Sequence, residues 1–211
     1  MQLTWFRAPT GDDAGTTNLC YEAVDLQIVR GRAVDVAVRQ GEETIDFANL
    51  LERVAALAGV MRGMGVTPGA RVAVLLDDPL DELLAFLAAA RIGAVHVALP
   101  EADPGSAIDR HTPALVVTSR VLTYADHTPP VVILRGPPPE DARRDLDWEV
   151  AVKAGRTDPA GTEPVAGDTT AYVLLDEAVP VSGVPGHDSR FARQLADLAA
   201  GRVIILEGSP E

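Results

Sequence analysis

Strand-like and helix-like segments alternate in the middle of the sequence. Arg71–Leu76 is apolar at nearly every position, which is typical of a strand buried on both faces of a parallel sheet. Asp78-Pro79 then starts a helix with leucines at three- and four-residue spacing, and Ala94–Leu99 is a second buried strand. A strand–helix–strand unit of this kind predicts an α/β fold with a doubly wound, mostly parallel sheet flanked by helices.

Other segments extend this pattern in both directions. Asn18 and Asp46 are predicted to cap helices, the second of which ends at the glycines Gly63 and Gly65. A helix is also predicted after Asp188. Strands are predicted at Val34–Val38, Glu43–Ile45, Ala114–Thr118, Val131–Leu134, Ala171–Leu175 and Val203–Leu206.

Length and composition bound the domain organisation. With 211 residues, 47% of them apolar, the chain can form one sizeable core, so we predict a single domain over residues 1–211. Within it, residues 136–167 are charged and rich in glycine, proline and aspartate. We interpret this segment as a flexible excursion around Trp148.

The charge balance excludes some classes of partner. A formal net charge of −13 repels phosphate backbones and anionic lipids, so neither nucleic acid nor a membrane surface is expected. Cys20 is the only cysteine, which excludes an internal disulfide, and no segment resembles a signal peptide or a membrane span. We therefore expect a cytoplasmic protein.

Several segments resemble the acetyl- and propionyl-CoA synthetase branch of the AMP-binding, adenylate-forming enzymes. The similarity begins at Trp5-Phe6 and Asn18–Asp25, and continues through Asp46–Leu51 and Gly65–Ala73. Ala88–His96 is the most characteristic segment. Lys153–Pro159 and Asp168–Leu175 resemble the approach to the phosphate loop of the family. The resemblance implies the N-terminal subdomain of an adenylate-forming enzyme, truncated relative to the whole enzyme.

The residues after this approach depart from the family pattern. In the family the strand that resembles Ala171–Leu175 leads into Y-T-S-G-T-T-G-x-P-K-G, whose glycines, hydroxyls and lysine hold phosphate. Here Asp176 and Glu177 replace two hydroxyl residues, Pro180 removes a backbone donor, and Val184 stands at the lysine position. We interpret this segment as a relict phosphate loop.

Electrostatics argues against triphosphate binding at the relict loop. Two unit charges about 5 Å apart interact by about 3 kcal/mol at an effective dielectric constant of about 20. Each carboxylate facing a phosphate at that distance would therefore weaken binding about a hundredfold. The later motifs of the family, which hold magnesium and ribose and supply a catalytic lysine, have no counterpart in this sequence. We therefore name no catalytic, metal or cofactor residue and expect no cofactor.

Other polar residues offer weaker candidates. His187-Asp188-Ser189 contains the residue types of a hydrolase triad, but adjacent residues cannot converge as a triad does, so we interpret them as a loop and a helix cap. The four histidines occur singly, without the spacing of metal ligands. Asp77, Leu99 and Ser119 are candidate residues of a ligand crevice beyond the strand ends, because open α/β sheets bind ligands there.

Three functional hypotheses remain. The first is a non-catalytic relative of the acyl-CoA synthetases, a pseudoenzyme that serves as a binding or regulatory subunit in acyl or carboxylate metabolism. A truncated sheet would expose apolar surface, so this hypothesis includes a protein partner or self-association. The second is one fragment of a split ATP-dependent acyl-activating ligase. The third is a sensor of an acyl group, a nucleotide or CoA, and a product without any role is also compatible with the sequence.

Overall fold

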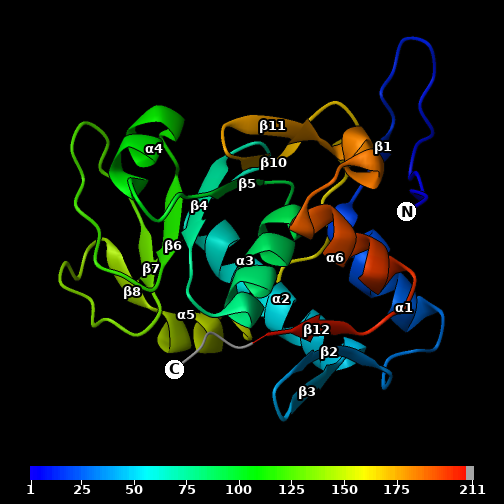
Figure 1. Ribbon diagram of the computed structural model, residues 1–211, viewed down its shortest axis with the longest axis horizontal. Helices are drawn as coiled ribbons and strands as arrows, with labels where there is room; N and C mark the ends of the chain where they lie inside the picture. The colour runs from blue at the N-terminus through cyan, green and yellow to red at the C-terminus, as the bar shows by residue number, and fades with distance from the viewer. Residues whose placement is uncertain (208–211) are drawn as a thin grey trace.

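A seven-stranded sheet forms the centre of the fold in the computed structural model of the chain, which describes residues 1–207 (Figure 1). In chain order the elements are β1 (Thr16–Thr17), the π-helical turn η1 (Tyr21–Asp25), α1 (Leu26–Val29), β2 (Val36–Gln40), β3 (Glu43–Asp46), α2 (Phe47–Gly63), β4 (Arg71–Leu75), α3 (Pro79–Arg91), β5 (Val95–Ala98), α4 (Pro104–His111), β6 (Leu115–Thr118), β7 (Val132–Leu134), β8 (Asp145–Asp147), α5 (Trp148–Gly155), β9 (Val165–Ala166), β10 (Thr170–Leu174), β11 (Glu177–Pro180), the 3₁₀ helix η2 (Val181–Gly186), α6 (Arg190–Ala199) and β12 (Ile204–Leu206).

The large sheet has the strand order β11-β10-β5-β4-β6-β7-β8. All neighbours in it pair parallel except β10 and β11, which pair antiparallel. The chain runs from β4 to β5 on one side and then crosses to β6 on the other side of β4. The predicted α/β fold with a mostly parallel sheet is thereby confirmed.

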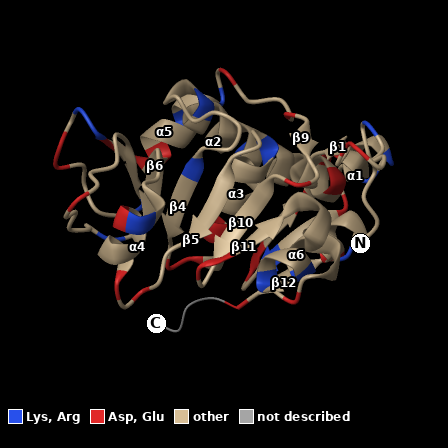
Figure 2. Ribbon diagram, turned by 90° about the horizontal axis from the view of Figure 1, so that it is seen from above, with Lys and Arg blue, Asp and Glu red and all other residues tan. Residues whose placement is uncertain are grey.

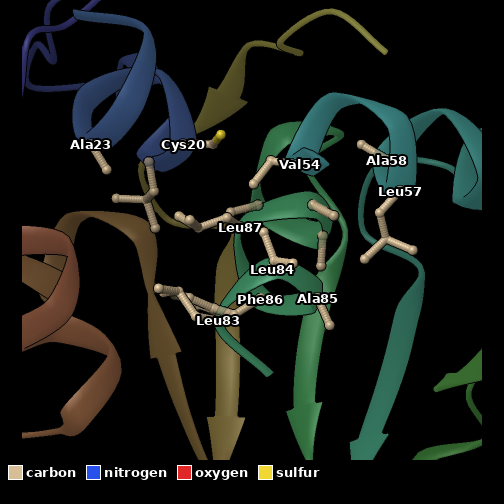
Figure 3. Packing of buried hydrophobic residues seen from close by; sticks show 14 of the residues in the cluster. Cys20, Ala23, Val54, Leu57, Ala58, Leu83, Leu84, Ala85, Phe86 and Leu87 are labelled. Carbon is tan, nitrogen blue, oxygen red and sulfur yellow. The ribbon is translucent and has the colours of Figure 1, made fainter. Parts of the chain in front are cut away.

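Alternate residues of each strand face opposite sides of the sheet, and both sides are apolar. Val72 and Val74 of β4 face the main core, which α2, α3, α5 and α6 cover; Figure 3 shows part of it. Ala73 and Leu75 face a smaller cluster to which α4 contributes Ala107 and Ile108. Burial on both sides explains the unbroken apolar runs in the sequence.

The helix starts follow the predicted caps. Asp46 accepts a hydrogen bond from the backbone N–H of Asn49 at the start of α2, and Asp78 accepts from Leu80 and Asp81 at the start of α3. The amide N–H of Tyr21 likewise donates to the side chain of Asn18. Each cap satisfies backbone donors that a first helical turn leaves without a partner.

The segment 136–167 contains regular structure that the sequence analysis did not predict. β8 extends the parallel sheet beyond β7, and α5 packs against α2 with Trp148 only 4% exposed. The helices approach closely because Gly59 and Gly155 have no side chain at their crossing. The segment interpreted as a flexible excursion therefore contains β8 and α5, and Trp148 is an anchor of the core.

Two smaller sheets involve the two ends of the described chain. β1 pairs with β9, and β2 lies between β3 and β12 (Figure 1). Ile204 and Leu206 of β12 are buried, whereas Ile205 between them is 73% exposed. Within residues 1–207, no helix is long and apolar enough to cross a membrane.

Candidate functional site

The segment interpreted as a relict phosphate loop is a tight β-hairpin. Leu174 of β10 pairs with Glu177 of β11, so only Leu175 and Asp176 form the turn. Both have positive φ, at 49° and 66°, which is the backbone of a type I′ hairpin turn. A two-residue turn does not form the run of inward-facing N–H groups that encloses a phosphate.

Two side chains of α4 hold the tip of this hairpin. The guanidinium of Arg110 and the imidazole of His111 contact the two carboxylate oxygens of Asp176, with 3.3 Å between His111 Nε2 and Asp176 Oδ1. The hydrogen bond from Arg110 lowers the pKa of the Asp176 carboxyl. Asp176 therefore stays ionised at neutral pH, and its charge opposes any phosphate near the turn.

Glu177 contacts a different group. Its carboxylate lies 3.5 Å from Nε2 of His187, and Nδ1 of the same ring lies 3.0 Å from the hydroxyl of Tyr172. The Tyr172 hydroxyl is in turn 2.7 Å from Oγ of Ser189. Asp176 and Glu177 are thus adjacent in sequence but take part in separate polar clusters.

Val184 is fully buried in η2, within the main core. It does not share a site with Asp176 at the tip of the hairpin, since it packs among apolar side chains. A lysine at this position would lose the hydration of its ammonium group without gaining a partner for the charge, because apolar side chains surround the site. The three residues of the predicted relict loop therefore lie in three different environments.

The structure brings two of the three predicted crevice residues together. The backbone N–H of Asp77 donates to Oγ of Ser119 over 3.0 Å, which joins the carboxyl ends of β4 and β6. Arg120 donates to Asp77 over 2.6 Å and lies 3.8 Å from Glu101. The hydrogen bond to Asp77 raises the pKa of Arg120, so its positive charge is held against the two acids.

Leu99 lies elsewhere, in the wall of a hollow at the carboxyl ends of β5 and β10. This open hollow has a volume of about 350 Å³ and lies between α4, the hairpin turn and the start of α6. Asp176, Arg110 and His111 line it on one side, and Arg190 on another. Basic and acidic side chains thus surround an apolar floor. Figure 2 shows acidic segments around β10, β11 and α4.

Sequence reasoning missed the residues that connect these features. No sequence motif marks Arg110 and His111, and the sequence predicts only a loop at His187, so the fold alone brings these residues to Asp176, Glu177 and Tyr172. Ser189 was considered as a helix cap, and it does cap α6 by accepting from the N–H of Ala192. Among residues 1–207 no group of three or more histidine, cysteine or acidic side chains is arranged to hold a metal ion.

Comparison with known proteins decides the family. A family profile described as AMP-binding enzyme matches residues 27–174, which is more than half of the chain. The chain belongs to the AMP-binding enzyme family. In this chain the matched region ends with β10, immediately before the hairpin turn.

Individual relatives agree with this assignment. The chain is 31% identical over 215 residues to the uncharacterized protein PA3568 of Pseudomonas aeruginosa, with 82% of this chain and 34% of that protein covered. It is 28% identical over 203 residues to mitochondrial acyl-CoA synthetase short-chain family member 3 of Mus musculus, with 81% and 29% covered. The chain therefore spans about a third of the length of these relatives.

Solved structures share the fold. The acyl-CoA synthetase of Brucella canis superposes with a TM-score of 0.72 and 21% sequence identity, over 93% of this chain and 44% of that chain. A mutant form of coronafacic acid ligase from Pectobacterium brasiliense gives a TM-score of 0.73 at 12% identity, over 90% and 46%. The resemblance to acyl-CoA synthetases inferred from the sequence is thus confirmed.

Proposed function

We propose that this chain is a non-catalytic member of the acyl-CoA synthetase group, which acts as a binding or regulatory subunit and forms no adenylate. The hairpin turn at Leu175-Asp176 carries this proposal. It stands directly after the last residues that match the family, and Arg110 and His111 hold its carboxylate in place. A bound triphosphate would have to displace this ion-paired carboxylate and find backbone donors that a two-residue turn lacks.

Exposed apolar side chains support a binding role. Leu175 at the hairpin tip is 86% exposed, and Ile205 on β12 is 73% exposed. Both lie on or next to strands at the edge of a sheet, where backbone groups are available for pairing with another chain. We therefore propose that the chain associates with a protein partner or with itself through such edges.

The hollow beside the hairpin favours a second candidate, a small-ligand sensor. Its basic lining from α4 and α6 and its apolar floor suit a ligand with an anionic head and an apolar portion, such as an acyl group, a nucleotide or CoA. The split-ligase alternative requires ATP binding, since adenylate formation consumes ATP. One experiment therefore tests the non-catalytic subunit, the sensor and the split ligase together.

That experiment is calorimetric titration with Mg-ATP, AMP, CoA and a short-chain acyl carboxylate, together with an assay of carboxylate-dependent pyrophosphate release. A full-length acyl-CoA synthetase serves as the positive control. We expect no heat with Mg-ATP and no pyrophosphate. Micromolar binding of Mg-ATP would overturn the proposal and favour the split ligase.

Binding of AMP, CoA or the carboxylate without ATP binding would favour the sensor. Arg190→Gln then locates the ligand, because Arg190 lines the hollow. Arg193→Gln is the matched control, since Arg193 lies one turn further along α6 and pairs with Asp188 instead. Loss of binding in Arg190→Gln alone would place the ligand in the hollow.

A further inference from the structure

A second hollow lies among α2, α3 and α5, and we call it the α5 hollow. It is open, has a volume of about 260 Å³, and differs in every described lining residue from the hollow beside the hairpin. Three arginines line it, namely Arg53 of α2, Arg135 after β7 and Arg156 after α5. Three guanidinium groups thus converge here, although the whole chain has 31 acidic residues against 18 lysines and arginines.

Arg135 is matched by acids of the same hollow. Its Nε donates to Asp81 over 2.6 Å, and its guanidinium also contacts Glu149. The guanidinium carbon lies 5.7 Å from the centre of the Trp148 ring, within the range of a cation–π contact. Asp81 is only 6% exposed, so this group of side chains forms a fixed polar wall. The charge of Arg135 is therefore not available to a ligand.

Arg53 and Arg156 differ from Arg135, because their partners lie outside the lining of the hollow. Nη2 of Arg53 lies 3.0 Å from Glu43 of β3, and Nε of Arg156 lies 3.1 Å from Glu52 of α2. The side chains of these two acids are 49% and 57% exposed, and ion pairs between exposed side chains contribute little to stability. Both guanidinium groups can therefore exchange these acids for an anion in the hollow at small cost.

The two available arginines lie at one end of the α5 hollow. Arg156 follows the last residue of α5, and its contact with Glu52 brings it beside the residue that precedes Arg53 on α2. Trp148 begins α5, a helix of eight residues, and therefore lies about 12 Å away along the helix axis. Apolar side chains of all three helices complete the lining: Leu57, Leu84 and Val152.

We propose that the α5 hollow binds a small phosphate monoester, with Arg53 and Arg156 holding the phosphate and the apolar side chains contacting the organic part. A phosphate monoester carries a charge of about −1.5 to −2 at neutral pH and offers three acceptor oxygens, which two planar guanidinium groups can share. A monocarboxylate would balance only one of the two arginines. A dicarboxylate would direct its second charge toward Asp81 and Glu149 at the other end of the hollow.

The size of the hollow and the charge of the chain limit the ligand further. A volume of about 260 Å³ is slightly below the range of about 300 to 1,000 Å³ that is typical of pockets for drug-sized molecules, so the organic part is small. The net charge of −13 repels anions, but salt screens this repulsion beyond about 10 Å at an ionic strength of about 0.1 M. The arginines of the hollow therefore decide the affinity of an anion that reaches it.

Titration of the full chain with phenyl phosphate, followed by nitrogen-15 NMR, tests the site. Inorganic phosphate and benzoate are the comparison probes, since the first lacks an apolar part and the second carries a single charge. We expect phenyl phosphate to bind more tightly than either and to shift the Nε–H signals of Arg53 and Arg156. The absence of a saturable shift, or equal affinities for phenyl phosphate and benzoate, would overturn the proposal.

Substitutions locate the ligand. We expect Arg53→Gln and Arg156→Gln each to weaken phenyl phosphate binding about tenfold or more, the effect of losing one charged hydrogen-bonding partner. Arg62→Gln is the matched control, because Arg62 also lies on α2 and pairs with an exposed acid, Asp158, but does not line the hollow. Thermal unfolding midpoints show whether each variant is folded. Equal weakening in Arg62→Gln, or loss of binding in Arg190→Gln alone, would overturn the proposal, the latter by placing the ligand beside the hairpin.

Discussion

His96 is a polar residue placed in a wholly apolar site. It lies on β5 between Phe86 and Phe191, with ring centroids 5.3 and 4.8 Å away, and neither of its ring nitrogens has a hydrogen-bond partner in the described structure. Burial lowers the pKa of its imidazole from 6.5 to about 3. Between about pH 3 and pH 6.5, the folded protein therefore keeps His96 neutral, whereas the unfolded chain protonates it.

This difference makes stability depend on pH. The contribution of neutral His96 to the free energy of unfolding is complete above pH 6.5. It decreases as the pH falls from 6.5 toward 3, because only the unfolded chain takes up the proton in that range. Between pH 7 and pH 5 we expect a loss of about 2 kcal/mol in the free energy of unfolding from this residue. Urea denaturation at both pH values measures it.

His96→Phe should flatten that dependence, since phenylalanine cannot be protonated and fits an aromatic cluster. His127→Gln is the control, because His127 is only part-buried and lies in a loop, bonded to the carbonyl of Pro113. It should keep the wild-type dependence. The explanation fails if His96→Phe loses as much stability on acidification as the wild type.

At the scale of elements, the crossing of α2 and α5 sets how closely two helices approach. A Cβ atom added to Gly155 would overlap the carbonyl oxygen of Ala56, and one added to Gly59 would overlap the carbonyl of Asp158. Both contacts are with backbone atoms, which cannot move aside as a flexible side chain can. The helices must therefore separate to admit a methyl group there.

We expect Gly155→Ala to destabilise the protein by about 2 kcal/mol, although alanine is the better helix former by about 1 kcal/mol. Gly63→Ala is the matched control, since Gly63 ends α2 with open space where its Cβ would be. That change should be neutral or stabilising. Thermal unfolding of the two variants distinguishes a steric cost from a propensity effect, and equal midpoints would contradict the steric explanation.

The same scale shows what the sequence could and could not predict. The helices at Asp46 and Asp78 were predictable because a capping side chain and an apolar stripe are local signals. β8 was missed because it has three residues, two of them aspartates, and owes its place to pairing with β7. α5 was missed although Asp147 caps it, because its inner face relies on Gly155, which a sequence reading treats as a breaker.

The candidate site was harder to predict than the fold. The prediction of a relict phosphate loop rests on Asp176 and Glu177, whose carboxylates stand where the family has hydroxyls. Their partners were not readable, since Arg110 lies 66 residues before Asp176 in the chain. The order of the strands, in which β6 lies on the opposite side of β4 from β5, determines which loops lie next to one another at the carboxyl ends of the strands.

For the whole molecule, the open edge formed by β12 is the feature most relevant to association. Among residues 1–207, β12 pairs only with β2, and its central side chain Ile205 faces solvent. Natural edge strands often carry a charged residue at such a position, which opposes pairing with another chain. The absence of a charge on these three residues supports the proposed association.

We expect Ile205→Lys to shift the protein toward the monomer at a concentration where the wild type associates. Val150→Lys is the control, because Val150 is similarly exposed at 68% but lies on a helix, with its backbone N–H already donated to Asp147. Sedimentation velocity over a range of concentrations measures both. A wild type that stays monomeric throughout, or equal effects of the two substitutions, would exclude association through this edge.

The pairing of β12 with β2 also orders events during synthesis. The side-chain amide of Gln27 donates to the carbonyl of Ala199, 172 residues further along the chain, and Ile204 of β12 pairs with Val38. At bacterial and eukaryotic translation rates, a ribosome needs on the order of ten seconds or more to make the intervening residues. During that time β3 is the only one of the two strands paired with β2 that has been made, and the carbonyl that accepts from Gln27 does not yet exist. The N-terminal elements are thus made first and completed last, and the surface that α6 and β12 cover stays exposed in the nascent chain until those elements have been made.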